Sequence, residues 1–412
     1  MRRSMVVLWV LSCIAFAASF ALGADLRLAD FTYVGAAQIA GTGQVNYGCA
    51  YRPETDTFFI IATNGNDPYY LREIRLPPVL NDPAQKCVVV KDWGMLNVNG
   101  QLNIAGAMLS MRGLHWDTTA KVLWYSFGSF YSGANNPFFG YVKFNDDGTK
   151  TVYGPWRVAD TIHSDTTKGQ FIDTPCDILR LTGYEIFAFG QRGATAQRQS
   201  GGPGLVLVKR PGWTQPAQTE VAAKSVVHWP MKTIILSGLA YSYSDFPRDE
   251  PTTFITGPTS APLFTDFNTY MQADGLHNVC VIGDTFVWTG SWAIGYSWYG
   301  GPTKYDALQL DSKIYPGQKM KSVSFSQGLH AEGYRPKIFL MRKADVISAY
   351  QTGNAKVLPY ESGNTQMLGG VVPMATTTFG GTYHNETQKR FYAVEFGAPN
   401  KLPIIRVWDL AI

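Results

Sequence analysis

Apolar and polar residues alternate along this chain in short runs that are separated by turn residues. GCAYRPETDTFFIIATNG (48–65) has a glycine, a short run that ends in an aromatic residue, a polar turn and an apolar run. The same order recurs in GLHWDTTAKVLWYSFGS (113–129) and GGTYHNETQKRFYAVEFG (380–397). Such runs on either side of a polar turn predict β-hairpins whose turns are longer than two residues.

The spacing across the predicted turn is nearly constant. The aromatic residue before it and the apolar residue after it are seven, seven and eight residues apart: Tyr51 and Phe58, Trp116 and Leu123, Tyr383 and Phe391. The last turn is therefore expected to be one residue longer than the others. Weaker copies of the pattern occur at 176–192 and 277–291, and a degenerate one at 238–257.

Two further strand-like runs tend to follow each hairpin: 69–76 and 87–94, 138–144 and 151–158, 204–210 and 223–229, and 336–342 and 355–360. Repeated groups of four strands predict an all-β fold, a β-propeller whose blades are four-stranded sheets. We expect five blades, which begin near 48, 113, 176, 277 and 380. A sixth blade around 238–257 is the alternative. One short helix is predicted at 344–353, where Gly353 would end it.

The final blade lacks a fourth strand, because the last hairpin is followed only by LPIIRVWDL (402–410). The N-terminal run FTYVGAAQIAG (31–41) can supply that strand. It would close the ring and leave no open sheet edge there. The similar stretches 48–65 and 380–397 would then be neighbours in space.

Composition agrees with a folded, β-rich domain. Of the 412 residues, 45% are hydrophobic, 14% are aromatic and only 16% are charged, and 41 glycines and 23 prolines can supply turns. The net charge of +4 is spread without a long run of Lys or Arg, so no nucleic-acid partner is expected.

The N-terminus, MRRSMVVLWVLSCIAFAASFALGAD, begins with two arginines, continues with an apolar stretch and ends in small residues. This pattern predicts a signal peptide over 1–23 and a single propeller domain over 24–412. An uncleaved membrane anchor and a lipidated Cys13 are the alternatives. We expect a secreted or periplasmic protein without a membrane span after cleavage, because no later run is long and apolar enough.

Four cysteines remain after the predicted cleavage: Cys49, Cys87, Cys176 and Cys280. Their spacing matches no zinc-binding pattern. Export permits disulfides, but free buried thiols that act as small apolar residues remain an equal alternative.

GGTYHNETQKRFYAVEFGAPNKLPIIRVWDL resembles the closing segment of a family of secreted, propeller-like bacterial proteins of uncharacterised activity. GLHAEGYRPKIFLMRKADVISAYQTGNAKVLPY is similar to their preceding segment, in which a Tyr-x-Pro step leads into a strand and a short helix. The resemblance is strongest over 275–412 and rests on turns and core strands. It implies the propeller fold and transfers no catalytic residue.

No motif in the chain identifies a reaction. The sequence has no nucleophile elbow, Walker loop, metalloprotease helix or Rossmann fingerprint. Propellers usually bind ligands where loops gather at one mouth of the channel. Loops that lead into first strands and loops that follow second strands are expected there. They contain the candidate ligand-binding residues Asn46, Tyr47, Arg112, Arg192, Trp292, Tyr296, Trp298 and Tyr299.

The stretch SWAIGYSWYGG (291–301) contains four of these candidates and is expected to be a loop. Exposed Trp and Tyr rings can stack on the apolar faces of sugars. The alternative is that these aromatic residues pack between blades or cover the end of one.

Candidate catalytic residues are Asp173, Asp274 and His277, because a glycosidase needs two carboxylates across the scissile bond. The alternative is that the acids cap turns and that the histidine is structural. No metal site or cofactor is expected, although calcium held by the acids is an alternative in an exported protein.

Three functions remain open. The leading hypothesis is a secreted propeller that binds an extracellular, carbohydrate-like ligand at the channel mouth without catalysis. The second is a carbohydrate-active hydrolase or lyase, and the third is a structural propeller that binds extracellular proteins. The missing reaction motif favours the two hypotheses without catalysis.

Overall fold

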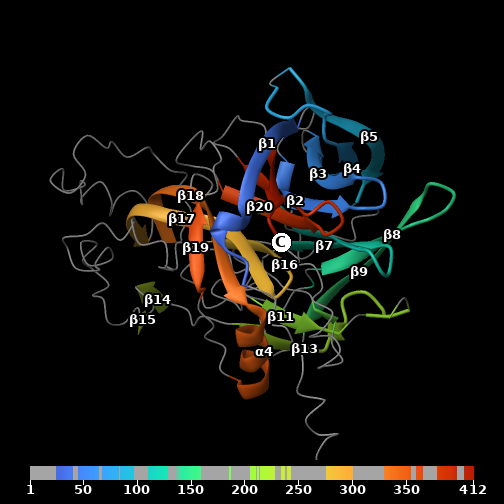
Figure 1. Cartoon of the computed structure of the whole chain (residues 1–412). Helices are drawn as coiled ribbons and strands as arrows, with labels where there is room; N and C mark the ends of the chain where they lie inside the picture. Colours follow the sequence, from blue (N-terminus) through green and yellow to red (C-terminus); the bar gives the residue numbers. More distant parts are fainter. Residues whose placement is uncertain are drawn as a thin grey trace, which may run out of the picture.

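The structure of the chain is a computed structural model that describes residues 25–39, 45–64, 67–82, 84–96, 110–128, 137, 139–158, 185–186, 205–209, 211–212, 214–227, 233–236, 239–242, 275–299, 329–353, 359–364, 378–396 and 403–412. Strands make up most of this part, and α4 (Lys343–Thr352) is its one α-helix (Figure 1). The predicted all-β class is confirmed. The predicted helix is confirmed too, and Gly353 ends it in the left-handed conformation.

Most of the described strands belong to four antiparallel units of four strands. They are numbered first, second, fourth and last, because a smaller third sheet lies between the second and the fourth in the sequence. The first unit contains β2 (Val45–Arg52), β3 (Thr57–Asn64), β4 (Asp67–Arg75) and β5 (Lys86–Met95). The second contains β6 (Ser110–Asp117), β7 (Val122–Gly128), β8 (Phe139–Phe144) and β9 (Lys150–Val158). The fourth contains β16 (Gly275–Ile282), β17 (Thr285–Tyr299), β18 (Leu329–Arg342) and β19 (Glu361–Asn364). The last contains β20 (Thr378–Asn385), β21 (Arg390–Phe396), β22 (Ile404–Leu410) and β1 (Phe31–Ile39).

Smaller sheets lie between the second and fourth units in the sequence. The third sheet contains β10 (Glu185–Ile186), β11 (Leu205–Val208) and β13 (Ala223–Val227). β12 (Glu220–Val221) pairs with β9, and β14 (Thr233–Leu236) forms a hairpin with β15 (Leu239–Ser242). The hairpin predicted at 176–192 lies mostly outside the described residues, as does most of 238–257.

Three of the predicted hairpins share one turn geometry. Their last strand pairs enclose four residues each: Arg52 and Thr57, Asp117 and Val122, Asn385 and Arg390. The final turn residue is left-handed in all three, with φ near +50° at Asp56, Lys121 and Lys389. The longer last turn expected from the sequence is therefore wrong. The shared turn explains the repeated sequence, because each copy must reverse the chain in the same four residues.

The N-terminal strand β1 supplies the fourth strand of the last unit, as predicted. It pairs with β22 from Phe31 and Leu410 at one end to Gln38 and Ile404 at the other. It also pairs with β5 of the first unit over two residues, Gln38 and Ile39. As a result, strands from both ends of the chain lie in one eight-stranded sheet.

The two similar stretches are neighbours in space, as expected. Tyr51 stacks on Tyr392 with ring centroids 5.2 Å apart, and Asn385 Nδ2 donates to Tyr51 Oη over 2.7 Å. The hairpins of the first and second units are linked in a similar way, because Trp116 Nε1 donates to Glu54 over 2.9 Å.

The segment before β1 crosses the fourth unit. Leu26 is buried, and its N–H donates to Thr285 Oγ1 over 3.2 Å. Tyr360 donates to the carbonyl of Leu26, and Arg342 binds Asp25. β1 is thus fixed to the last unit by its ladder and to the fourth unit by the residues that precede it.

Buried apolar clusters lie between the units. One cluster joins the first, second and last units and includes Ile60, Leu123 and Tyr392. Another joins the last unit to the fourth, through residues such as Trp408 and Cys280.

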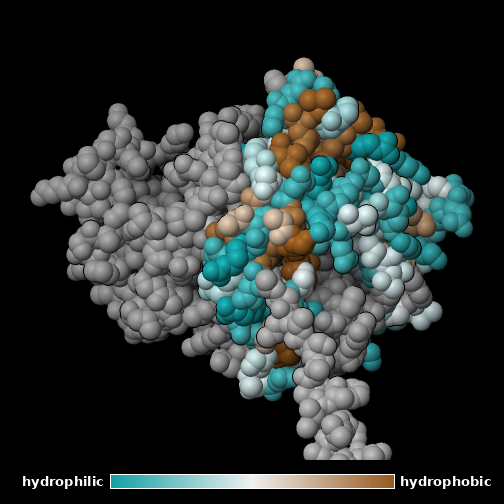
Figure 2. All heavy atoms as spheres, in the orientation of Figure 1, coloured by the Kyte–Doolittle hydropathy of each residue, from teal (hydrophilic) through white to brown (hydrophobic). Residues whose placement is uncertain are grey.

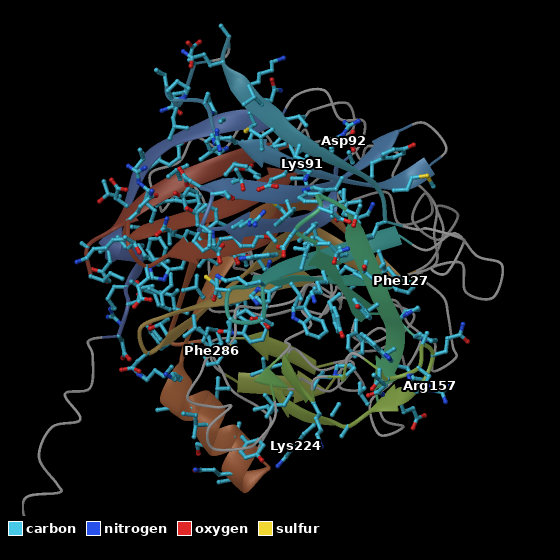
Figure 3. The ribbon with its side chains drawn as sticks, turned by 90° about the vertical axis from the view of Figure 1, so that its right-hand side faces the viewer. Lys91, Asp92, Phe127, Arg157, Lys224 and Phe286 are labelled. Atoms are coloured by element: carbon cyan, nitrogen blue, oxygen red, sulfur yellow. The ribbon has the colours of Figure 1, made fainter. Side chains whose placement is uncertain are left out.

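The third sheet packs on both of its neighbours. Val208 lies in a cluster with Trp156 of the second unit, whereas Leu207 lies in a cluster with Trp288 of the fourth unit. Lys224 of this sheet also lies over the ring of Tyr350 in α4, with Nζ 3.9 Å from the ring centroid (Figure 3).

The outer strand β5 exposes apolar side chains. Val88, Val89 and Val90 are exposed, and so is Val79 in the connection before them. Figure 2 shows the corresponding apolar surface where β5 lies in Figure 1.

The fourth unit differs from expectation at its outer strand. That strand was predicted over 355–360, whereas β19 begins at Glu361. Its partners are Lys337 to Leu340 of β18.

Among the described cysteines, Cys49, Cys87 and Cys280 are buried and are not in a disulfide. Cys176 lies outside the described residues. Of the two alternatives from the sequence, the buried thiol therefore holds for these three residues.

We expect Trp408→Ala to lower the free energy of unfolding by about 3–5 kcal/mol, because a fully buried indole leaves a cavity. Its ring lies 5.6 Å from that of Phe391 and 5.8 Å from that of Tyr33. The neighbouring Asp409→Ala is the control. Asp409 is half exposed and forms a surface ion pair with Arg390, so its loss should cost under about 1 kcal/mol. Urea unfolding measures both, and equal effects would contradict the packing described.

Stability should also fall in alkali. Burial raises the pKa of Cys87 from 9.0 to about 12 and that of Tyr392 from 10.0 to about 12. The unfolded chain therefore loses these protons first, so stability is full below about pH 9 and declines towards pH 12. Urea unfolding between pH 8 and 11 would show this decline. Cys87→Ala should flatten it, and an unchanged slope in that variant would contradict the assignment.

Candidate functional site

The four described first strands share one irregularity. Each shifts its register against the second strand at a single place: between Val45 and Cys49, Met111 and Gly113, Leu276 and Asn278, and Phe379 and Thr382. Regular pairing then continues for four or five residues to the hairpin turn in every unit. The shifts therefore lie at one level of the fold, at the end opposite to the hairpin turns.

The first strands are also neighbours. β16 contacts β20, β20 contacts β2, and β2 contacts β6. The register shifts are thus brought into one row across four units. Bulges of this kind re-aim side chains and are frequent beside active sites.

Four of the residues predicted for the site lie at these shifts. Asn46 and Tyr47 lie within the shift of β2, Arg112 is the extra residue of β6, and His277 is the extra residue of β16. They were expected in loops before the strands, but the structure places their backbone inside the strands. The difference arises because a bulge keeps an irregular residue within a continuing ladder.

The predicted aromatic loop is instead a strand. β17 continues to Tyr299 and pairs with β18 from Arg335 to Leu329, so Trp292, Trp298 and Tyr299 lie in a ladder. A shift between Ile294 and Ser297 contains Tyr296. The aromatic and β-branched residues favour a strand over the loop that Gly and Ser indicated. This arm extends beyond the start of β16, to the left in Figure 1.

Three predicted residues, Asp173, Asp274 and Arg192, lie outside the described residues. Within the part of the chain that the structure describes, no group of three or more His, Cys, Asp or Glu side chains could hold a metal ion.

A polar layer lies beside the row of shifts, between the fourth and last units. It consists of Asn278, Thr289, Thr382, Glu395 and Arg406, all of which are buried. Asn278 and Thr289 pair across β16 and β17, and Thr289 Oγ1 donates to Thr382 Oγ1 of β20 over 3.5 Å.

An ion pair forms the other half of the polar layer. Arg406 Nε donates to Glu395 Oε2, and Arg406 Nη1 donates to Tyr33 Oη over 3.3 Å. The side chains of Arg406 and Glu395 are only 3% and 0% exposed. A buried pair of this kind keeps both charges compensated where water cannot reach them.

The sequence reasoning missed the polar layer. The sequence did contain an indication of it, in the strand FYAVEF. Glu395 alternates there with Phe391 and Ala393, so it is expected on the same, core-facing side of the strand. Charged residues are almost never fully buried unless they are paired, so a charge at a core-facing position predicts a buried partner.

The comparisons with known proteins leave the function open. No family model matches the sequence, and no curated protein matches it either. The predicted resemblance to a bacterial propeller family therefore stays a prediction. No helix in the described part of the chain is long and apolar enough to cross a membrane.

Solved structures with some likeness include a luciferin-regenerating enzyme, at 6% identity and a TM-score of 0.35, over 90% of this chain and 94% of that chain. A polysaccharide lyase matches at 10% identity and a TM-score of 0.23, over 88% of this chain and 57% of that chain. At these values neither likeness bears on the fold or the activity of this chain.

We expect Gly381→Ala to lower the free energy of unfolding by about 1–3 kcal/mol, because the row of shifts is closely packed. A Cβ at Gly381 would overlap Tyr383 Oη and lie 2.9 Å from the carbonyl oxygen of Cys49 in β2. The control is Gly212→Ala, where a Cβ would meet no atom within 4 Å. Thermal unfolding compares the two variants, and similar stability would show that β20 and β2 are farther apart than described.

Proposed function

We propose that the chain is a secreted, five-bladed β-propeller that binds an extracellular, carbohydrate-like ligand at the channel mouth. In this proposal the signal peptide of residues 1–23 is removed, and the protein binds its ligand without cleaving it. The row of register shifts in the first strands is the observation that carries the proposal.

The packing between sheets supports the ring. Apolar clusters join the first unit to the second, the second to the third sheet, the third sheet to the fourth unit, and the fourth unit to the last. The last unit shares a cluster with the first, and β1 pairs with strands of both. Five sheets linked in this order correspond to five blades, and the pairing of β1 would close the ring.

The first strands of a propeller line its channel, so their shifts would form a rim at one mouth. Asn46, Tyr47, Arg112 and His277 belong to strands at this level, and in the proposal they supply hydrogen-bonding groups to the ligand. In the same proposal the arm of β17 contributes Trp292, Tyr296, Trp298 and Tyr299. Polar groups next to aromatic rings are the combination that sugar rings require, because sugars have apolar faces and polar rims.

Binding requires only these groups, whereas hydrolysis would also require the two carboxylates, Asp173 and Asp274. We therefore propose a binding protein in preference to a hydrolase. Calcium bound by these two acids would be an additional feature of the proposed binding protein.

A glycan array on the mature chain, residues 24–412, tests the proposal with and without a chelator. We expect binding of at least one glycan and unchanged masses of the bound glycans in mass spectrometry. Cleavage products would favour the hydrolase or lyase instead, and loss of binding with chelator would indicate a cation. Absence of any binding would contradict the proposed function.

Arg112→Ala should weaken binding of the positive glycan about tenfold, because one charge-assisted hydrogen bond at the rim is lost. Arg390→Ala is the matched control, since Arg390 lies at the hairpin end and forms an ion pair with Asp409 there. Equal affinity of the two variants would show that the ligand does not bind at the row of shifts.

A further inference from the structure

Two atoms of the polar layer have no hydrogen-bond partner among the residues that the structure describes: Asn278 Nδ2 and Glu395 Oε1. The other polar atom of each group is bonded and fixes its orientation. Asn278 Oδ1 accepts from the N–H of Val279 over 2.6 Å, and Glu395 Oε2 accepts from Arg406. Buried polar groups are nearly always satisfied by protein, water or ligand, so this donor and this acceptor call for a third group.

Both residues lie on strand faces that meet between the fourth and last units. Asn278 alternates along β16 with Cys280 and Ile282, which lie in the apolar cluster between the fourth and last units. Glu395 alternates along β21 with Phe391 and Ala393 of that same cluster. Alternate residues of a strand share one face, so Asn278 and Glu395 approach this space from opposite sides.

The polar layer is the end of this space that lies nearest to the row of shifts. Asn278 directly follows the shift of β16, and Glu395 pairs with Phe379, which directly precedes the shift of β20. The apolar cluster fills the space towards the hairpin turns. A group that reaches Asn278 and Glu395 must therefore enter from the side of His277 and the β17 arm.

We propose that the polar layer is a subsite that binds hydroxyl groups of the ligand, with Asn278 Nδ2 as donor and Glu395 Oε1 as acceptor. This inference rests on the proposed function and deepens it by naming the ligand class. A hydroxyl group both accepts and donates, so it matches an amide N–H and a carboxylate oxygen together.

The charges of the layer select a neutral ligand. Arg406 is its one cation and is already paired with Glu395. An acidic group would meet a carboxylate without a compensating cation, which is costly in a buried site. The subsite therefore fits neutral, polyhydroxylated glycans and disfavours uronates and sulfated sugars.

Asn278→Leu is the principal test, because it removes the donor and keeps a similar volume. We expect affinity for a neutral oligosaccharide that the wild type binds to fall about tenfold. The melting temperature of the free protein should change little, since loss of the unpaired buried donor offsets loss of the acceptor for the Val279 N–H. Calorimetric titration and thermal unfolding measure the two effects.

Thr285→Val is the matched control. Thr285 is a buried polar residue of the same sheet, but it lies at the hairpin end and binds Leu26 and Tyr360. Its replacement should lower the melting temperature and leave glycan affinity unchanged.

A double variant, Glu395→Gln with Arg406→Met, tests the charge selection and guards against poor folding of Asn278→Leu. It replaces the ion pair as a unit, which buried pairs often tolerate. We expect at least a tenfold loss of the preference for neutral over uronate-containing oligosaccharides.

The outcomes separate the two proposals. A wild-type protein that binds no glycan contradicts the proposed function and, with it, the subsite. Wild-type binding that Asn278→Leu and the double variant leave unchanged overturns the subsite alone and assigns the two atoms to buried water. A wild-type preference for uronates or sulfated sugars also overturns the subsite while the proposed function stands.

Discussion

The structure depends on the need of its sheets to bury an apolar surface on both faces. In β21, Phe391 and Ala393 face the fourth unit, whereas Tyr392 and Val394 face the first. Such a sheet cannot bury both faces by itself, so it is stable only between two others. Every unit therefore requires neighbours on both sides, and the units at the ends of the chain are covered by each other.

The same constraint separates structural from functional regions along each strand. Towards the hairpin turns, apolar and aromatic side chains fill the space between sheets, as Phe58 and Tyr392 do with ring centroids 5.3 Å apart. At the level of the register shifts, polar residues such as Asn278 and Glu395 replace them. In the proposed function, packing fixes the strands at one end and the other end binds the ligand, which is how binding sites are commonly supported.

Local features of the fold could be predicted from the sequence, and features that depend on distant partners could not. The hairpin at Tyr51 and Phe58 was readable because turn and strands lie within one short segment. The register shift at His277 was not, because a bulge is defined only against the partner strand. Aromatic residues of the β17 arm were read as a loop for the same reason, since their partner β18 begins thirty residues later. The ion pair of Glu395 and Arg406 links two strands. In the sequence it is visible only as a charged residue within an apolar pattern.

The pairing of β1 with β22 has a consequence for how the chain reaches this structure. Phe31 and its partner Leu410 lie 379 positions apart in the sequence. No early segment can therefore complete the last unit, and contacts of such long sequence separation form slowly. Until β1 pairs with it, β22 would present an open edge, so the last unit is protected from pairing with other chains only once both of these distant segments are in place.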